Sequence, residues 1–318
     1  MAAEPNAAEL ARRKRGQELL NGKRGQNTAH RLQHIYRALD QGAVYPFSPT
    51  SMQPRPFPAL TPGQRLHLEV HGYVVVESVF SADECEEMKR DLYAIEEAFK
   101  ATGDLPNGMD PNQFSWFTAT EEDFFRVDNI PHLCESFYKY VTHPRLLAMM
   151  EEITGVEVRL EQSDAHIRRP THGGKPTKGR HRYGLHGGQR GYMGRAFEHT
   201  DKGLFHYSFV KTLTNLTDLG PDDGGTVVIA GSHKIDSTVD PSEIIEAAME
   251  NPSLIHHVVA PAGSVLVFYE ATMHASGIID SDKDRLLMIS GYTPANMGTW
   301  MGYQPDPIFL RHCPAEVP

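Results

Sequence analysis

The sequence contains a His-x-Asp motif, made of His199, Thr200 and Asp201. Alternate residues of an extended strand point to the same face, so the imidazole of His199 and the carboxylate of Asp201 can reach one metal ion. His274 is the best-placed second imidazole, because it follows the apolar run 264–268, which is typical of a strand. Two imidazoles and one carboxylate on one face of a metal leave three positions open, an arrangement that lets an iron(II) centre bind a cosubstrate and O2. The sequence therefore predicts a metal site of His199, Asp201 and His274.

A cationic stretch precedes this motif. Residues 165–197 contain no Asp or Glu but carry eight cations, namely Arg168, Arg169, Lys175, Lys178, Arg180, Arg182, Arg190 and Arg195. One interpretation is a glycine-rich surface loop of the kind that often borders active sites. The other is that some of these side chains pair with a carboxylate or phosphate of a substrate. On the second interpretation Arg168, Arg180 and Arg182 bind a small to medium, anionic metabolite. His206, seven residues after His199, either lines the same pocket or fills a strand.

Composition narrows the class of protein. The 318 residues carry a net charge of −10, which argues against nucleic-acid binding by global electrostatics. The three cysteines, Cys85, Cys134 and Cys313, are widely spaced and odd in number, which indicates a reducing compartment. No stretch approaches the about 20 apolar residues of a membrane span. We expect a cytoplasmic protein that binds a small molecule, neither nucleic acid nor membrane, as a monomer or homodimer.

The chain divides into an N-terminal segment and one large domain. Residues 1–64 are expected to form a helical arm and a proline-rich strap, and residues 65–318 the domain. Helices are predicted over 82–100, 144–153 and 241–249. Strands are predicted over 71–77, 156–162, 210–216, 226–230, 255–259, 264–268 and 285–292, with 210–216 and 226–230 joined as a hairpin that residues 231–234 close. Many short strands after a helical first third predict a mainly β fold, a sandwich or barrel with helices against one side.

Several of these segments together resemble the phytanoyl-CoA dioxygenase family of Fe(II)- and 2-oxoglutarate-dependent oxygenases. The resemblance spans residues 65–295 and rests on five short segments, at 72–76, 199–201, 224–226, 231–234 and 274–276, followed by Arg285. It implies a double-stranded β-helix core, the jelly roll of cupin-like proteins. It also implies Fe(II), 2-oxoglutarate and O2 as cofactors, with His199, Asp201 and His274 as the iron ligands. Arg285, eleven positions after His274, and Ser276 would hold the far carboxylate of 2-oxoglutarate. Hydroxylation of an unactivated C–H bond is the default reaction, with desaturation or ring closure as other outcomes.

Three alternatives stay open. His186 is a rival first ligand, and in that register Gly188 stands where the carboxylate belongs, as in the halogenating branch of these enzymes, where chloride fills the vacancy. A halogenase would then use His186, Gly188 and His274. The same fold could also serve as a non-catalytic binding module or hold another divalent metal, since His and Asp also bind Zn²⁺. Arg285 and Ser276 argue against a plain metal hydrolase, which has no need of a dicarboxylate clamp.

Overall fold

The computed structural model describes residues 55–106, 119–120, 123–170, 184–187, 196–199, 204–235 and 239–297. The strands form three antiparallel sheets. The largest has the order β1 (Tyr73–Val76), β10 (Val265–Tyr269), β7 (Val210–Asn215), β12 (Arg285–Pro294), β4 (Val158–Arg168), β3 (Phe124–Asp128) and β2 (Ala119–Thr120). The second has the order β11 (His274–Ser276), β8 (Thr226–Ile229) and β9 (Ile255–His257), and the third pairs β5 (Ala196–His199) with β6 (Leu204–Tyr207).

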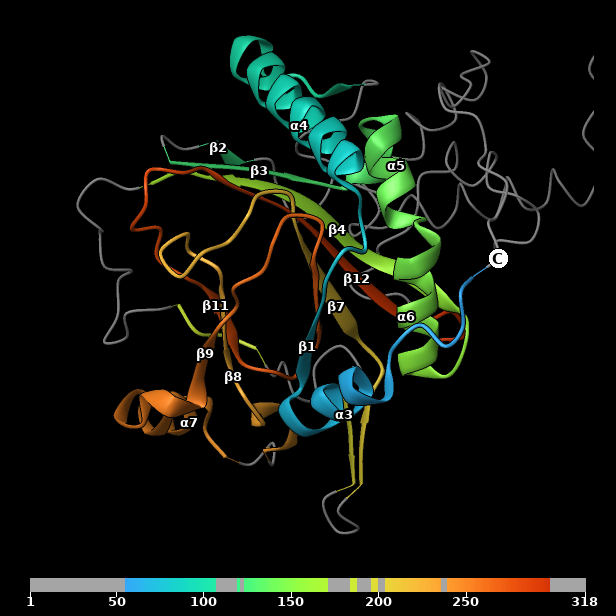
Figure 1. The fold of residues 1–318 in the computed structure, drawn as a ribbon, viewed down its shortest axis with the longest axis vertical. Coiled ribbons are helices and arrows are strands. Elements are labelled where there is room, and N and C mark those ends of the chain that lie inside the picture. The colour runs from blue at the N-terminus through green and yellow to red at the C-terminus, as the bar shows by residue number, and fades with distance from the viewer. Residues whose placement is uncertain are drawn as a thin grey trace, which may run out of the picture. The chain divides into compact units, whose positions relative to one another are not determined.

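Helices cover the outer faces of these sheets. The α-helices are α3 (Pro62–His71), α4 (Ala82–Thr102), α5 (Glu135–Val141), α6 (Pro144–Thr154) and α7 (Pro241–Glu250), with short 3-10 helices η2 (Ile130–His132), η4 (Ser232–Lys234) and η5 (Pro252–Leu254). Helices α4, α5 and α6 lie along one side of the large sheet, and α7 lies beside the small sheet (Figure 1). The mainly β fold with flanking helices is therefore confirmed. No helix in the described ranges is both long and apolar enough to cross a membrane.

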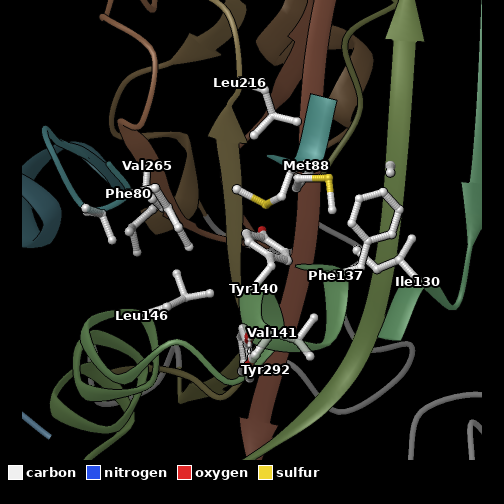
Figure 2. Packing of buried hydrophobic residues seen from close by; sticks show 14 of the residues in the cluster. Phe80, Met88, Ile130, Phe137, Tyr140, Val141, Leu146, Leu216, Val265 and Tyr292 are labelled. Atoms are coloured by element: carbon white, nitrogen blue, oxygen red, sulfur yellow. Dashed lines mark hydrogen bonds between the residues drawn. The ribbon is translucent and has the colours of Figure 1, made fainter. Parts of the chain in front are cut away.

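Strand β12 shows how alternation builds two separate cores. Leu286 and Met288 point to the helical side, where they join a large cluster with buried residues of α4, α5 and α6 (Figure 2). Leu287 points the other way and packs with Val228 of the small sheet. Side chains that alternate along a strand face opposite sides of the sheet. Arg285, in phase with Leu287, therefore faces the space between the two sheets.

Local signals set the helix ends. Ser81 caps α4 through a complete capping box with Glu84, as predicted, whereas the helix continues past the predicted end at residue 100 to Thr102, and Gly103 ends it in the left-handed conformation at φ 76°. Gly155 ends α6 in the same way, at φ 75°. These helix ends depend on only a few neighbouring residues, because a cap forms hydrogen bonds with the backbone groups of its own turn.

The sequence-based prediction was wrong or incomplete in other places. Segments 210–216 and 226–230 do not form a hairpin, because β7 belongs to the large sheet and β8 to the small one. Strand β4 does not end at residue 162 but continues to Arg168, so the first cation of the basic stretch belongs to a strand. Helices α3 and α5 and strand β3 were not predicted.

The predicted boundary at residue 64 stays a prediction, since residues 1–54 lie outside the described ranges. Leu60, which belongs to the proposed strap, is buried in the cluster between the helices and the large sheet. Thr61 caps α3 through a capping box with Gln64. The described end of the strap is thus packed onto the domain.

Candidate functional site

Two histidines meet at the edge of the small sheet. The backbone of His186 forms an isolated antiparallel bridge with that of His274 in β11, through hydrogen bonds of 2.9 and 2.7 Å. The two imidazole rings lie with their centroids 4.4 Å apart. Glycine is required beside His186, because a Cβ on Gly187 would lie 2.5 Å from the carbonyl oxygen of Thr272, and its φ is +132°. Close approach of the two backbones therefore places the two rings together.

Both rings are oriented by hydrogen bonds to backbone carbonyls. Nδ1 of His274 lies 2.9 Å from the carbonyl oxygen of Thr272, and Nδ1 of His186 lies 2.9 Å from that of Gly184. A carbonyl oxygen only accepts, so in each neutral ring Nδ1 carries the proton and Nε2 keeps its lone pair. This is the arrangement that protein metal sites use to orient imidazole ligands. The two rings therefore suit a divalent metal ion.

Electrostatics keep His274 in the form that a metal requires. Burial lowers the pKa of His274 well below its usual value, and His186 and Lys211 lower it further. Lys211 lies on β7 and forms an ion pair with Glu270, with Nζ 3.1 Å from Oε2. Among the described residues, no third His, Cys, Asp or Glu joins the two imidazoles to complete a metal site.

A pair of arginines, the buried Arg285 and the half-buried Arg168, lies further along the same inner surface. Arg285 is 1% exposed and donates from Nη1 to the carbonyl oxygen of Gly224, at 2.6 Å, and from Nη2 to Oγ1 of Thr226, at 2.9 Å. Arg168 lies directly opposite Arg285 in the β12–β4 register and donates from Nη1 to Oγ of Ser276, at 2.7 Å. The two guanidinium groups, Ser276 and Thr226 form a cluster that we call the arginine clamp.

The arginine clamp forms no close ion pair with a carboxylate of the described residues. Asp123 acts on the charge of Arg168 without an ion pair within 4.0 Å, and Nε of Arg285 has no hydrogen-bond partner in the described structure. Burial, and then the neighbouring Arg168, lowers the pKa of Arg285 to about 9. Two adjacent cations with little exposure to water are unfavourable unless an anion joins them. A planar carboxylate is the group that a guanidinium pair binds best.

The clamp stands at a fixed distance from the histidine pair. Ser276 follows His274 by two residues on β11, so both side chains project from the same face, about 7 Å apart along the strand. A dicarboxylate with one end at the imidazoles and the other at the arginines fits this spacing. The donor set therefore suits both groups, the metal at the histidines and the 2-oxoglutarate at the clamp.

The other predicted site residues fall in different places. His199 ends β5, which pairs with β6 in the two-stranded sheet, not in the sheet that carries His274. His206 lies on β6 opposite Phe197. Asp201, Gly188, Arg180 and Arg182 lie outside the described residues. The structure thus brings together His186 with His274, and Arg168 with Arg285 and Ser276.

Sequence reasoning did not place Arg168 or Thr226 beside Arg285. It proposed Arg168 as a substrate ligand because Arg168 is one of the cations of the stretch 165–197, and it ended the strand at residue 162. The pattern Gln162, Asp164, His166, Arg168, in which every second residue is polar, was the available signal for a longer strand with a polar inner face. Thr226 stood in a segment that carried the family resemblance but received no role.

The chain is similar to several known proteins. Dioxygenase af480 of Aspergillus fumigatus is 24% identical over 234 residues, which cover 73% of this chain and 66% of that protein. HygX from Streptomyces hygroscopicus, crystallised with nickel and 2-oxoglutarate bound, superposes with a TM-score of 0.54 at 22% identity, covering 76% of this chain and 90% of that one. SnoK, a non-haem α-ketoglutarate-dependent carbocyclase from nogalamycin biosynthesis, superposes with a TM-score of 0.55 at 19% identity, covering 84% and 95% of the two chains.

The sequence profile of one family spans most of the domain. It is described as Phytanoyl-CoA dioxygenase (PhyH) and matches residues 68–287. That segment includes the histidine pair and the whole arginine clamp. The protein therefore belongs to the phytanoyl-CoA dioxygenase family of non-haem enzymes that use Fe(II), 2-oxoglutarate and O2.

Proposed function

We propose that this protein oxidises an unactivated C–H bond of a small to medium metabolite, with conversion of 2-oxoglutarate to succinate and CO2. Hydroxylation is the proposed outcome. Desaturation or ring closure would begin with oxidation of the same substrate carbon and differ only in how that carbon then reacts. The arginine clamp carries the proposal, because it offers one buried and one half-buried guanidinium group that form no close ion pair with a described carboxylate, one strand repeat from His274.

Each group of the site has a separate task. Arg285 and Arg168 bind the far carboxylate of 2-oxoglutarate, and the hydroxyls of Thr226 and Ser276 hold the guanidinium groups in place. The neutral imidazole of His274 offers Nε2 to the metal. Bound iron supplies the oxidising chemistry, and the protein supplies position and exclusion of water. The inner face of the sheets is apolar at Leu287 and Val228, which keeps water from the cosubstrate.

Two ligand sets are proposed for the metal. The first is His199, Asp201 and His274, supported by the His-x-Asp spacing, which supplies a carboxylate. The second is His186, Gly188 and His274, the set of a halogenase. It is supported by the bridge between His186 and His274, by the 4.4 Å separation of the rings and by the Nδ1 hydrogen bond of each ring. These contacts support His186 as a candidate first imidazole.

Anaerobic reconstitution with Fe(II) and 2-oxoglutarate separates the two sets. The iron chelate of 2-oxoglutarate has a weak visible charge-transfer band, which would be recorded for wild type, His186→Ala, His199→Ala and Asp201→Ala. Loss of the band in His186→Ala alone supports the second set, and chloride-dependent product would make the enzyme a halogenase. Loss in His199→Ala and Asp201→Ala supports the first set. Absence of a band in wild type would overturn the oxygenase proposal and return the jelly-roll binding module to consideration.

An anionic substrate remains part of the proposal on narrower support. Arg168 belongs to the arginine clamp, and Arg169 forms a two-pronged pair with Glu96, at 2.9 and 2.5 Å. The support therefore rests on Arg180 and Arg182. Charge reversal of either should raise the substrate KM while slow 2-oxoglutarate turnover without substrate continues. An unchanged KM in both variants would remove the anionic group from the proposal.

Location and assembly complete the proposal. Cys85 and Cys134 are free thiols, as expected in a reducing compartment such as the cytoplasm. We propose a monomer or homodimer, which light scattering of the purified protein would test. A larger assembly would contradict this part.

A further inference from the structure

A row of polar side chains lies on the inner face of β3 and β4. Arg168 marks this face, because its Nη1 reaches across to Ser276 of the small sheet. Alternation along β4 places His166, Asp164 and Gln162 on the same side as Arg168. These three side chains and two from β3 form what we call the polar wall.

Strand pairing supplies the other two members of the polar wall. Arg126 of β3 lies opposite His166, and Asp128 lies opposite Asp164. Directly opposed residues of an antiparallel pair share one face, so both point into the space between the sheets. On the other side of β4, Leu287 of β12 lies opposite His166 and packs with Val228 of the small sheet. The polar wall is therefore part of the barrel interior and begins beside the arginine clamp.

The polar wall contains more negative than positive charge. Arg126 is shared by two carboxylates, with Nε 2.7 Å from Oδ1 of Asp128 and Nη2 3.2 Å from Oδ2 of Asp164. Two carboxylates and one guanidinium leave an excess negative charge. Burial, and then the neighbouring Asp164, raises the pKa of Asp128 to about 7. This part of the interior therefore suits a neutral or cationic group better than an anion.

Several atoms of the polar wall lack partners although they are buried. Asp164 is 1% exposed, and Gln162 and Arg126 both donate to its Oδ2, while Oδ1 lies 3.4 Å from Nε2 of His166 without a well-aligned hydrogen bond. Oε1 of Gln162 has no hydrogen-bond partner in the described structure. Native proteins satisfy nearly all buried polar atoms, so such atoms point to a group that is bound from outside. Oδ1 and Oε1 only accept, so that group must donate.

We propose that the polar wall binds the substrate through its hydrogen-bond donors, a hydroxyl or ammonium group held by Asp164 and Gln162. The proposal rests on the function proposed above and names the chemistry of the substrate beside the reacting centre. The anionic group proposed above is a separate part of the substrate from this donor. Asp164 and Asp128 are then residues that determine specificity, and neither takes part in 2-oxoglutarate binding.

Three ring compounds of similar size test the proposal on the full chain. The probes are cis-1,2-cyclohexanediol, cis-2-aminocyclohexanol and cyclohexanecarboxylate, titrated to millimolar concentration with Ni(II) in place of iron, with and without 2-oxoglutarate. The readout is the unfolding midpoint, which rises when a ligand binds the native state. We expect the diol or the amino alcohol to raise it and the carboxylate to leave it unchanged. The stronger of the first two responses tells whether hydroxyl or ammonium is preferred.

Variants connect the response to the polar wall. Asp164→Asn should weaken binding of the responding probe about tenfold to a hundredfold, the range for a lost hydrogen bond to a charged group. Asp128→Asn is the second variant, in case the first is too unstable, and exposed Asp282→Asn is the matched control. Binding of 2-oxoglutarate is measured in wild type and in each variant. If wild type does not bind 2-oxoglutarate, the proposed function is overturned, independently of the polar wall. A carboxylate that binds as well as the other probes, no response to any probe, or affinities within twofold in both wall variants would overturn the polar-wall proposal.

Discussion

At the scale of single residues, the candidate site depends on side chains that a few hydrogen bonds hold in place. Arg285 is held at both ends of its guanidinium by Gly224 and Thr226, so its plane is fixed before any ligand binds. Preorganisation of this kind lowers the entropy cost of binding. The remaining free edge, at Nε, faces no partner within the described part of the chain.

Arg285→Gln should weaken 2-oxoglutarate binding about a hundredfold, because a buried charge partner of the carboxylate is lost. The affinity of Arg285→Lys for 2-oxoglutarate should lie between those of Arg285→Gln and wild type, since an ammonium cannot match the planar carboxylate with two hydrogen bonds. Isothermal titration with Ni(II)-loaded protein measures both affinities. Lys283→Gln, whose side chain is 65% exposed, is the control and should bind as wild type does. Equal affinity for all four proteins would show that Arg285 does not hold the cosubstrate.

His233 makes stability depend on pH. Its ring is 3% exposed, with Nε2 3.3 Å from the carbonyl oxygen of Glu69. Burial is the main reason that the pKa of His233 falls to about 4, below the 6.5 of an unperturbed histidine. Between these two values the unfolded chain binds more protons than the folded chain, so the free energy of unfolding falls as pH falls.

His233→Gln should reduce this pH dependence. From pH 7 to pH 4.5, the variant should lose about 2 kcal/mol less of its free energy of unfolding than wild type does. Urea denaturation at a series of pH values gives both curves. Exposed His257→Gln serves as the control and should follow wild type. Parallel curves for His233→Gln and wild type would mean that this ring does not titrate on unfolding.

At the scale of elements, the active site depends on strands that touch without a hairpin between them. Residues 184–187 meet β11 through the bridge of His186 and His274 and through packing of Leu185 near Ala275, and β8 meets β11 through three paired residues. Each contact joins segments that are distant in the chain. The residues at the contact must therefore be small enough for the two backbones to approach each other. Gly187 permits one such approach.

Gly187→Ala should separate the two histidines. The new Cβ would meet the backbone of Thr272, so the bridge must shift. If His186 is a ligand, metal affinity should fall about tenfold to a hundredfold, the range seen when groups that orient a ligand are changed. Competition with a coloured chelator measures the affinity for Ni(II). Gly184→Ala is the matched control, because nothing lies within 4 Å of a Cβ there. Unchanged affinity in Gly187→Ala would count against His186 as a ligand.

At the scale of the described domain, stability and chemistry lie on opposite faces of the large sheet. The outer face packs on helices and contains most of the buried apolar side chains, whereas the inner face holds the arginine clamp, the polar wall and a smaller apolar cluster. Leu92 of α4, which is 0% exposed, belongs to the outer cluster. Leu287 of β12 belongs to the inner one.

Leu92→Ala should lower the free energy of unfolding by about 2–5 kcal/mol while the folded fraction binds 2-oxoglutarate normally. Leu287→Ala should lower both the stability and the affinity, because Leu287 lies two residues after Arg285 on the inner face. Urea denaturation and titration of 2-oxoglutarate give the two quantities. Leu66→Ala, at a position 65% exposed, is the control. Weakened 2-oxoglutarate binding in Leu92→Ala would show that the two faces are coupled.

The sequence by itself determined the local features and the class of chemistry. Ser81 with Glu84, and Gly155 after α6, set helix ends within a single turn. His274 was proposed as a ligand because it follows an apolar strand, and Arg285 was proposed through the family resemblance. The family and its cofactors followed from such segments taken in order.

Only the tertiary structure decided which distant residues meet. The contact of His186 with His274 and the pairing of Arg168 with Arg285 depend on strand register between segments far apart in the chain. A shift of one residue would turn every side chain of a strand to its other face, and no local pattern specifies the partner strand. The same reason hid the polar wall, whose members Arg126 and Asp164 come from strands joined by no short turn. Sequence spacing could identify candidate ligands, but it could not show which of them share one space.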